Sequence, residues 1–147
     1  MDSHVTDTIT LGPIGVEFLV DENASGGSVT VFECAVAAGA KVPAPHSHDG
    51  FDETIYGLEG VTTWTVDGEP NDVGPGDAIC IRRGHVHGFV NQGPDDAKFL
   101  AVATPGVFGP AYFRDMGDVL AAAAGGPPNL EAVGVVMRRH GLTPAVG

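Results

Sequence analysis

Two glycine-bounded segments of the chain carry histidines and an acid in a spacing that could bind a metal ion. In the first segment His46 and His48 are two residues apart, and Glu53 follows shortly after; the second segment supplies His87. On a strand, residues i and i+2 point to the same face, so both rings of the pair would lie together. Imidazole suits Zn, Fe, Ni or Cu, and a carboxylate adds negative charge against a dication. Three imidazoles and one carboxylate that converged inside a barrel would form a metal site with room for a substrate.

The elements that would position these side chains are short strands separated by turns. Apolar and β-branched residues alternate over 28–37, and further strands are expected at 53–57, 61–66, 78–82, 89–90 and 99–104. A first strand pair is expected within 9–20, around Gly12-Pro13. Asp67-Gly68 is a strong hairpin signal, because both residues readily adopt a positive φ. Evenly spaced short strands of this kind predict an all-β sandwich or small barrel.

The C-terminal third changes to helical patterning. A helix is expected within 108–124, and a second one over 130–140, with Asn129 as its N-cap and Gly141 just after its end. Val133, Val136, Met137 and His140 recur at helical spacing, so they should give this second helix one packing face.

Composition limits the classes of protein and partner. The chain has 147 residues, 43% of them apolar, with 22 Gly, 11 Pro and a formal net charge of -12. This predicts one domain over 1–147, with a barrel at about 9–105, a helical extension at about 108–141 and a loose N-terminal arm over 1–8 that includes His4. The acidic balance argues against nucleic acid and anionic membranes as partners, and no apolar run is long enough to span a membrane. We expect a cytoplasmic protein in which Cys34 and Cys80 are reduced thiols.

The two segments resemble the two consensus motifs of the cupin superfamily. His46, His48, Glu53 and Gly60 fit the first motif, and Gly76, Gly84, His87 and Asn91 fit the second. The short separation between the motifs is similar to that of compact, single-domain, quercetinase-like cupins, and the resemblance covers roughly residues 28 to 105. It implies a double-stranded β-helix, the jelly-roll cupin barrel, followed by short helices. It also implies one divalent transition metal (Fe, Ni, Mn, Co, Cu or Zn) on His46, His48, Glu53 and His87, and a homodimer.

The sequence departs from the cupin pattern in three places. Six residues, not five, separate Gly39 from His46, and Arg82 stands where the family usually has Pro. His85 is an additional histidine two residues before His87, so a four-histidine shell with Glu53 outside it is an alternative. The Gly84 turn argues against that alternative, because a residue just after a turn rarely keeps strand alternation.

Several residues near the two motifs could serve either the fold or the cavity. Trp64 could line the cavity or pack in the core, and Cys80 could be a core or a pocket residue. Tyr56 alternates away from Glu53 and should lie outside the cavity. Arg82 and Arg83 should point in opposite directions, most simply into solvent.

Three functions are open for such a centre, all with a small-molecule ligand. The first is a metal-dependent dioxygenase of an aromatic or enolisable molecule, in which Glu53 takes the substrate proton. The second is non-redox chemistry on zinc or a similar ion, as in a polyketide cyclase, an isomerase or a lyase. The third is a binding module without turnover, because fold alone does not settle function.

Overall fold

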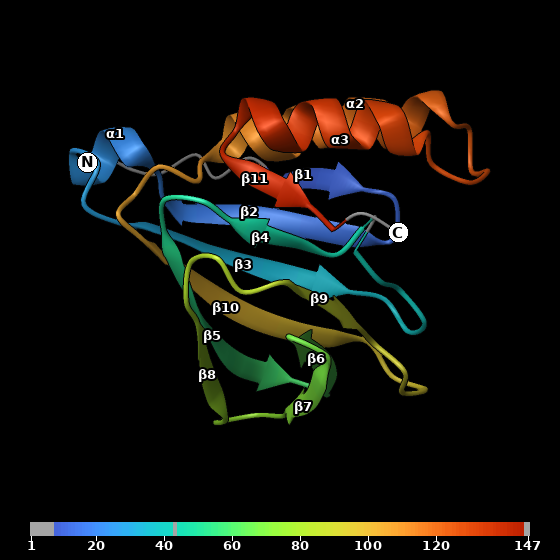
Figure 1. Cartoon of the computed structure of the whole chain (residues 1–147). Coiled ribbons are helices and arrows are strands. Elements are labelled where there is room, and N and C mark those ends of the chain that lie inside the picture. The colour runs from blue at the N-terminus through green and yellow to red at the C-terminus, as the bar shows by residue number, and fades with distance from the viewer. Residues whose placement is uncertain (1–7, 43, 146–147) are drawn as a thin grey trace.

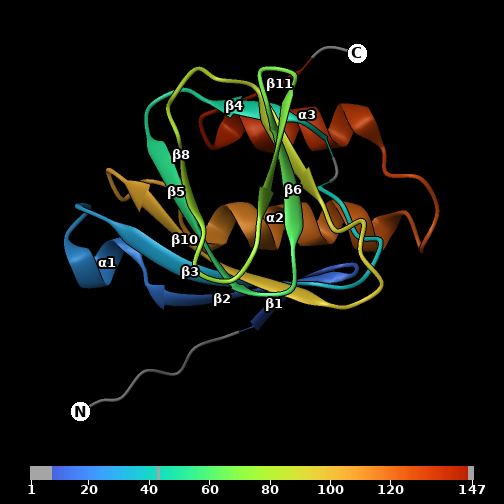
Figure 2. The same ribbon diagram turned by 90° about the horizontal axis from the view of Figure 1, so that it is seen from below.

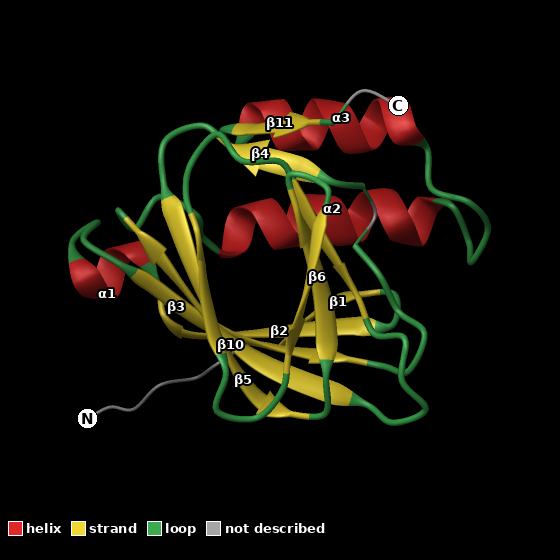
Figure 3. Cartoon of the chain, turned by 60° about the horizontal axis from the view of Figure 1, so that its bottom comes forward, coloured by secondary structure: helices red, strands yellow, loops and turns green. Residues whose placement is uncertain are grey.

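The chain folds into two antiparallel β-sheets that face each other, with two helices beside them (Figures 1 and 3). The computed structural model describes residues 8–42 and 44–145. Most of the expected N-terminal arm, His4 included, and Pro43 lie outside these residues. The first sheet has the strand order β1 (Thr8–Leu11), β2 (Ile14–Val20), β3 (Thr30–Val36), β10 (Ala97–Thr104), β5 (Asp52–Glu59), β8 (Ala78–Ile81). The second has the order β11 (Leu142–Pro144), β4 (His46–His48), β9 (His87–Val90), β6 (Thr62–Val66), β7 (Glu69–Val73).

The all-β class is confirmed, with one qualification about closure. The strand ladders of the described residues form two sheets, so the expected barrel is not closed by a continuous hydrogen-bonded ladder. The hairpin between β6 and β7 turns at Asp67 and Gly68, whose φ values are 49° and 86°, as the sequence predicts. Alternate residues of β3, from Thr30 to Val36, are buried, which places one face of the first sheet against the interior.

Two helices lie side by side against β1 and β11 (Figure 2). Helix α2 (Pro110–Ala122) buries Tyr112, Phe113 and Met116. A side chain at Gly117 would come within 2.9 Å of the carbonyl oxygen of Thr10, so this glycine allows α2 to approach β1 closely. A short helix, α1 (Glu22–Ser25), is capped by Asp21 and was not predicted from the sequence. No helix of the described residues is long and apolar enough to cross a membrane.

The second C-terminal helix agrees with its prediction. Helix α3 (Leu130–Arg139) begins after Asn129, whose side chain accepts a hydrogen bond from the amide of Ala132 at 3.2 Å. Val133, Val136 and Met137 are buried as the expected packing face, whereas His140 is only partly buried and bonds Asp115. The chain then returns as β11, which pairs with β4 and covers the outer edge of the strand that carries two of the histidines.

Candidate metal centre

Three histidines from two neighbouring strands converge in the interior. His46 and His48 lie on β4, and His87 is the first residue of β9, directly opposite His46 in the ladder. One ring nitrogen from each lies within 4.8 Å of the other two, and all three side chains are buried. The spacing of two residues in β4 and the antiparallel register together produce this cluster.

Backbone carbonyls fix the orientation of two of the rings. Nδ1 of His46 donates to the carbonyl of Ala44 at 3.0 Å, and Nδ1 of His87 donates to the carbonyl of His85 at 3.0 Å. With the proton on Nδ1, Nε2 of each ring carries the free lone pair. This arrangement of a ring nitrogen on a backbone oxygen is the usual support for a metal-binding histidine.

The third ring provides the test of whether these residues suit a metal. Both nitrogens of His48 are buried and lack a hydrogen-bond partner among the described residues. The ring stacks on Phe51 with centroids 4.1 Å apart, so its position is fixed by packing. An unpaired buried nitrogen costs about 1–3 kcal/mol, and a metal ion would satisfy one of the two. The residues present therefore fit a metal ion.

Glu53 approaches the histidines from the opposite sheet. It lies on β5, is 5% exposed, and places Oε1 3.8 Å from Nε2 of His87. Its oxygens are not within the group of mutually close atoms that the three rings form. Burial raises the pKa of this carboxyl from 4.5 to about 8, because a charged carboxylate is poorly solvated in this interior.

Burial and mutual repulsion keep the three imidazoles neutral. The pKa of His46 is lowered to about 3 and that of His48 to about 2, in each case by burial first and then by the neighbouring rings. The pKa of His87 is also lowered by burial. Neutral imidazole is the form that binds metals, so the apo site is held in the protonation state that a metal needs.

The cluster opens into a small, mainly apolar cavity of about 60 Å³. Glu53 and the three histidines contribute to its lining, together with Cys34 and Tyr112 as further polar side chains. The described lining contains no lysine or arginine. The apolar part comes from both sheets and from the segment around α2: Leu11, Ile14, Val16, Phe32, Val42, Trp64, Phe89, Phe99, Phe108 and Phe113.

The structure decides the position of several residues that the sequence left open. His85 is exposed and bonds the carboxylate of Asp67, so it lies outside the cluster, as the Gly84 turn indicated. Trp64 lines the cavity, and its Nε1 donates to Thr62 Oγ1 at 2.8 Å. Tyr56 is 44% exposed, as predicted.

Two expectations about surface and pocket residues are resolved. Cys80 is exposed, so the reading of it as a core or pocket residue is wrong; in β8 the neighbouring Ile81 takes the buried face, so Cys80 points to the opposite, exposed face. Arg82 and Arg83 are both exposed, and Arg83 forms an ion pair with Asp52 at 3.2 Å.

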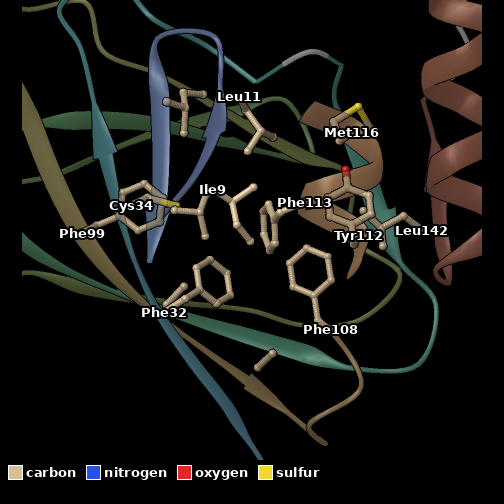
Figure 4. Close-up of a cluster of buried hydrophobic side chains, with 14 of the residues drawn as sticks. Ile9, Leu11, Phe32, Cys34, Phe99, Phe108, Tyr112, Phe113, Met116 and Leu142 are labelled. Carbon is tan, nitrogen blue, oxygen red and sulfur yellow. The ribbon is translucent and has the colours of Figure 1, made fainter. Parts of the chain in front are cut away.

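The sequence reasoning missed the contributions of Cys34 and of α2 to the cavity. Cys34 could have been found, because it shares the buried face of β3 with Phe32. Phe108, Tyr112 and Phe113 carried no such signal, since their position depends on where α2 docks. Figure 4 shows these aromatic side chains beside Phe32 and Ile9 in the core.

Comparison with known proteins places this geometry in a family. The profile described as Cupin domain matches residues 32–103, which include all three histidines and Glu53. The chain belongs to the cupin superfamily. Quercetin 2,3-dioxygenase of Bacillus subtilis (strain 168) is 36% identical over 73 residues, which are 50% of this chain and 21% of that protein. This cupin therefore spans about a fifth of the length of that curated relative.

Solved cupin structures extend the comparison. The polyketide cyclase RemF from Streptomyces resistomycificus has a TM-score of 0.62 and 27% identity, over 71% of this chain and 78% of that chain. A sugar phosphate isomerase from Silicibacter pomeroyi has a TM-score of 0.56 and 28% identity, over 64% of this chain and 60% of that chain. Cupins similar to this chain thus include enzymes of different reaction types.

Proposed function

We propose that this cupin is a metal-dependent enzyme for a small, largely apolar, oxygen-bearing molecule, and that the reaction is a dioxygenation of an aromatic or enolisable substrate. The observation that carries the proposal is the convergence of three buried, neutral imidazoles and one buried carboxylate on an apolar cavity. The similarity to a quercetin dioxygenase supports the choice of reaction.

In this proposal His46, His48 and His87 hold the metal, and Glu53 completes the ligand set or stands beside it as a base. A bound divalent ion would supply Lewis acidity and, if it is redox-active, an electron-transfer route to O2. Nδ1 of His46 and of His87 remains on a backbone carbonyl throughout, so Nε2 stays directed into the cluster.

Glu53 is the group proposed to move a proton. A carboxylate oxygen takes the proton of the substrate's enol or phenol hydroxyl, and the substrate is left as an oxyanion beside the three imidazoles. General bases work best when their pKa lies near the operating pH, and burial places that of Glu53 at about 8 before any cation lowers it. Glu53 is 5% exposed and the surrounding lining is mainly apolar, so its carboxyl has little contact with bulk solvent.

The cavity lining restricts the substrate class. No lysine or arginine of the described lining could balance a phosphate, so a phosphorylated sugar is disfavoured as the substrate. Cavities for drug-sized ligands measure about 300–1,000 Å³, far above the roughly 60 Å³ found here. A small enolisable ketone or diketone fits this size better than a flavonol.

The test is oxygen consumption after reconstitution with single metals. Apo-protein would be loaded with Fe, Ni, Mn, Co, Cu or Zn and supplied with small β-diketones, dihydroxylated aryl ketones and flavonols in an oxygen electrode. We expect O2 uptake with at least one redox-active ion, and a much lower kcat for Glu53→Gln with its metal retained. Conversion at equal rates with and without O2 would refute the dioxygenase.

A non-redox reaction is the second candidate, and the similarity to the polyketide cyclase RemF specifically favours it. Zinc would then support full activity, and turnover would be independent of O2. Substrate binding without conversion under any metal would instead favour a binding module.

A further inference from the structure

We propose that the hydroxyl of Tyr112 donates a hydrogen bond to an oxygen atom of the molecule held at the three-histidine centre, and so makes helix α2 part of the ligand-binding site. This inference rests on the proposed metal centre and names a binding residue that lies outside the segment matched to the cupin family, residues 32–103.

Tyr112 is in the first turn of α2 and lines the same cavity as His46, His48, His87 and Glu53. It is 4% exposed, although α2 itself lies on the outside of the sheets. Its ring is fixed by aromatic neighbours, with centroids 5.0 Å from Phe108 and 5.1 Å from Phe113 (Figure 4). The ring is therefore held in place by packing.

Among the other polar groups of the lining, His48 and Glu53 are assigned to the metal and to proton transfer in the proposed function, and the remaining donors are bonded or weak. The indole of Trp64 is already bonded to Thr62, and Nδ1 of His46 and of His87 is bonded to backbone oxygens. Cys34 offers only a weak thiol donor. The hydroxyl of Tyr112, by contrast, forms no hydrogen bond with any residue that the structure describes. The hydroxyl is therefore free to donate to an oxygen atom of a ligand in this cavity.

Electrostatics make Tyr112 a donor and not a base. Burial, and then the negative charge of Glu53, raises the pKa of the phenol well above its usual value of 10.0. The hydroxyl stays protonated across the physiological range. A donor of this kind interacts most strongly with an acceptor that carries negative charge, such as an enolate or carboxylate oxygen.

These features define the ligand class. A metal ion and one neutral donor would face a mainly apolar space of about 60 Å³ without lysine or arginine. Such a site fits a small ketone, enolate or carboxylate with a single negative charge. A ligand that binds metal only through nitrogen and has no oxygen acceptor would gain nothing from Tyr112.

The experiment compares two metal-binding probes in two matched variants. Tyr112→Phe removes only the hydroxyl, and Tyr56→Phe removes the hydroxyl of an exposed tyrosine on β5. Each protein would be loaded with Co(II), and its visible spectrum would be titrated with pentane-2,4-dione and, separately, with imidazole. Metal content and melting temperature would be recorded for each variant.

We expect Tyr112→Phe to weaken binding of the dione by about tenfold or more, because a hydrogen bond to a charged acceptor contributes about 1.5–3 kcal/mol. Imidazole binding and Co(II) content should remain unchanged, and Tyr56→Phe should match the wild type with both probes. Equal weakening for both probes would show that the hydroxyl only supports the fold, and unchanged dione binding would overturn the inference directly.

A second measurement covers the case in which Tyr112→Phe does not fold. The chain has two tyrosines, so Tyr56→Phe protein made with 3-fluorotyrosine carries a single label, at position 112. Its fluorine resonance in the Zn-loaded protein should shift on addition of pentane-2,4-dione and not on addition of imidazole; identical responses to both would refute the inference. Failure of the wild type to bind Co(II) or Zn would refute the metal centre itself. Tight dione binding without O2 uptake under any redox-active ion would refute only the dioxygenation of this dione.

Discussion

The metal-free protein should have a stability optimum near pH 6.5, and Glu53→Gln should remove the decline on its alkaline side. Native Glu53 keeps its proton up to a pH of about 8, whereas the unfolded chain releases it near 4.5. The native state therefore binds more protons between these values, and its free energy of unfolding falls as pH rises, by about 1.4 kcal/mol per pH unit. Over the whole interval this amounts to at most about 5 kcal/mol.

The histidines produce the opposite slope in acid. Their pKa values are lowered by burial, to about 3 for His46 and about 2 for His48, with His87 shifted in the same direction. Below pH 6.5 the unfolded chain takes up protons on the rings of His46 and His48 while the native state does not, so the free energy of unfolding falls as pH falls. After subtraction of the Glu53 contribution, these two rings should lower it by about 1.4 kcal/mol per pH unit there, and His87 adds a further loss in the same direction.

The assay is urea unfolding in chelator from pH 5 to 9. Glu53→Gln should unfold like the wild type near pH 5 and become more stable than the wild type by several kcal/mol at pH 8.5. Glu69→Gln, which neutralises an exposed carboxylate on β7, should follow the wild type throughout. If the free energies of unfolding of Glu53→Gln and of the wild type changed in parallel with pH above 6.5, the idea that burial holds a proton on this carboxyl would be refuted. With metal bound, the wild type should be more stable than Glu53→Gln, because a bound cation stabilises the ionised form of Glu53.

Three further predictions follow from individual residues. His87→Ala should abolish stoichiometric metal binding measured by elemental analysis, whereas His85→Ala should retain the metal because His85 is exposed and bonds Asp67. Saturating metal at about one hundred times the dissociation constant should stabilise the wild type by about 2.7 kcal/mol and leave His87→Ala unchanged, which thermal unfolding would show. Asn91→Ala should lower the unfolding free energy by about 2 kcal/mol or more in urea, since the buried amide of Asn91 donates to the carbonyls of Val36 and Asp95 and accepts from Gly93; a change below about 0.5 kcal/mol would contradict this assignment.

The sequence was most informative where local spacing determines geometry. The separation of two residues between His46 and His48 placed both on one face of β4, and the Asp67-Gly68 turn fixed one hairpin. The N-cap of α3 at Asn129 was also readable, because capping depends on neighbours in the chain. These features need no knowledge of distant residues.

Features that depend on long-range docking could not be predicted in this way. Strand β11 is three residues long, and its pairing with β4 depends on where α3 ends. The contribution of Tyr112 and Phe113 to the cavity depends on the close approach of α2 to β1 at Gly117. Periodicity identifies the buried face of such a helix but not the surface that it covers.

The residues of the candidate site lie on separate elements, so each part of the site can change without the others. The histidines belong to the second sheet, Glu53 belongs to the first, and Tyr112 belongs to α2. Substitutions in α2 can therefore alter the size and polarity of the cavity while the backbone carbonyls that orient His46 and His87 stay in place. Because Glu53 faces His87 across the two sheets, a small change in sheet separation would alter its distance to the histidine cluster without breaking a strand ladder. If Glu53 is the base and the histidines hold the metal, as proposed, the cavity wall, the base and the metal ligands can change independently, which gives a physical reason why cupins with similar histidine clusters can serve different reactions.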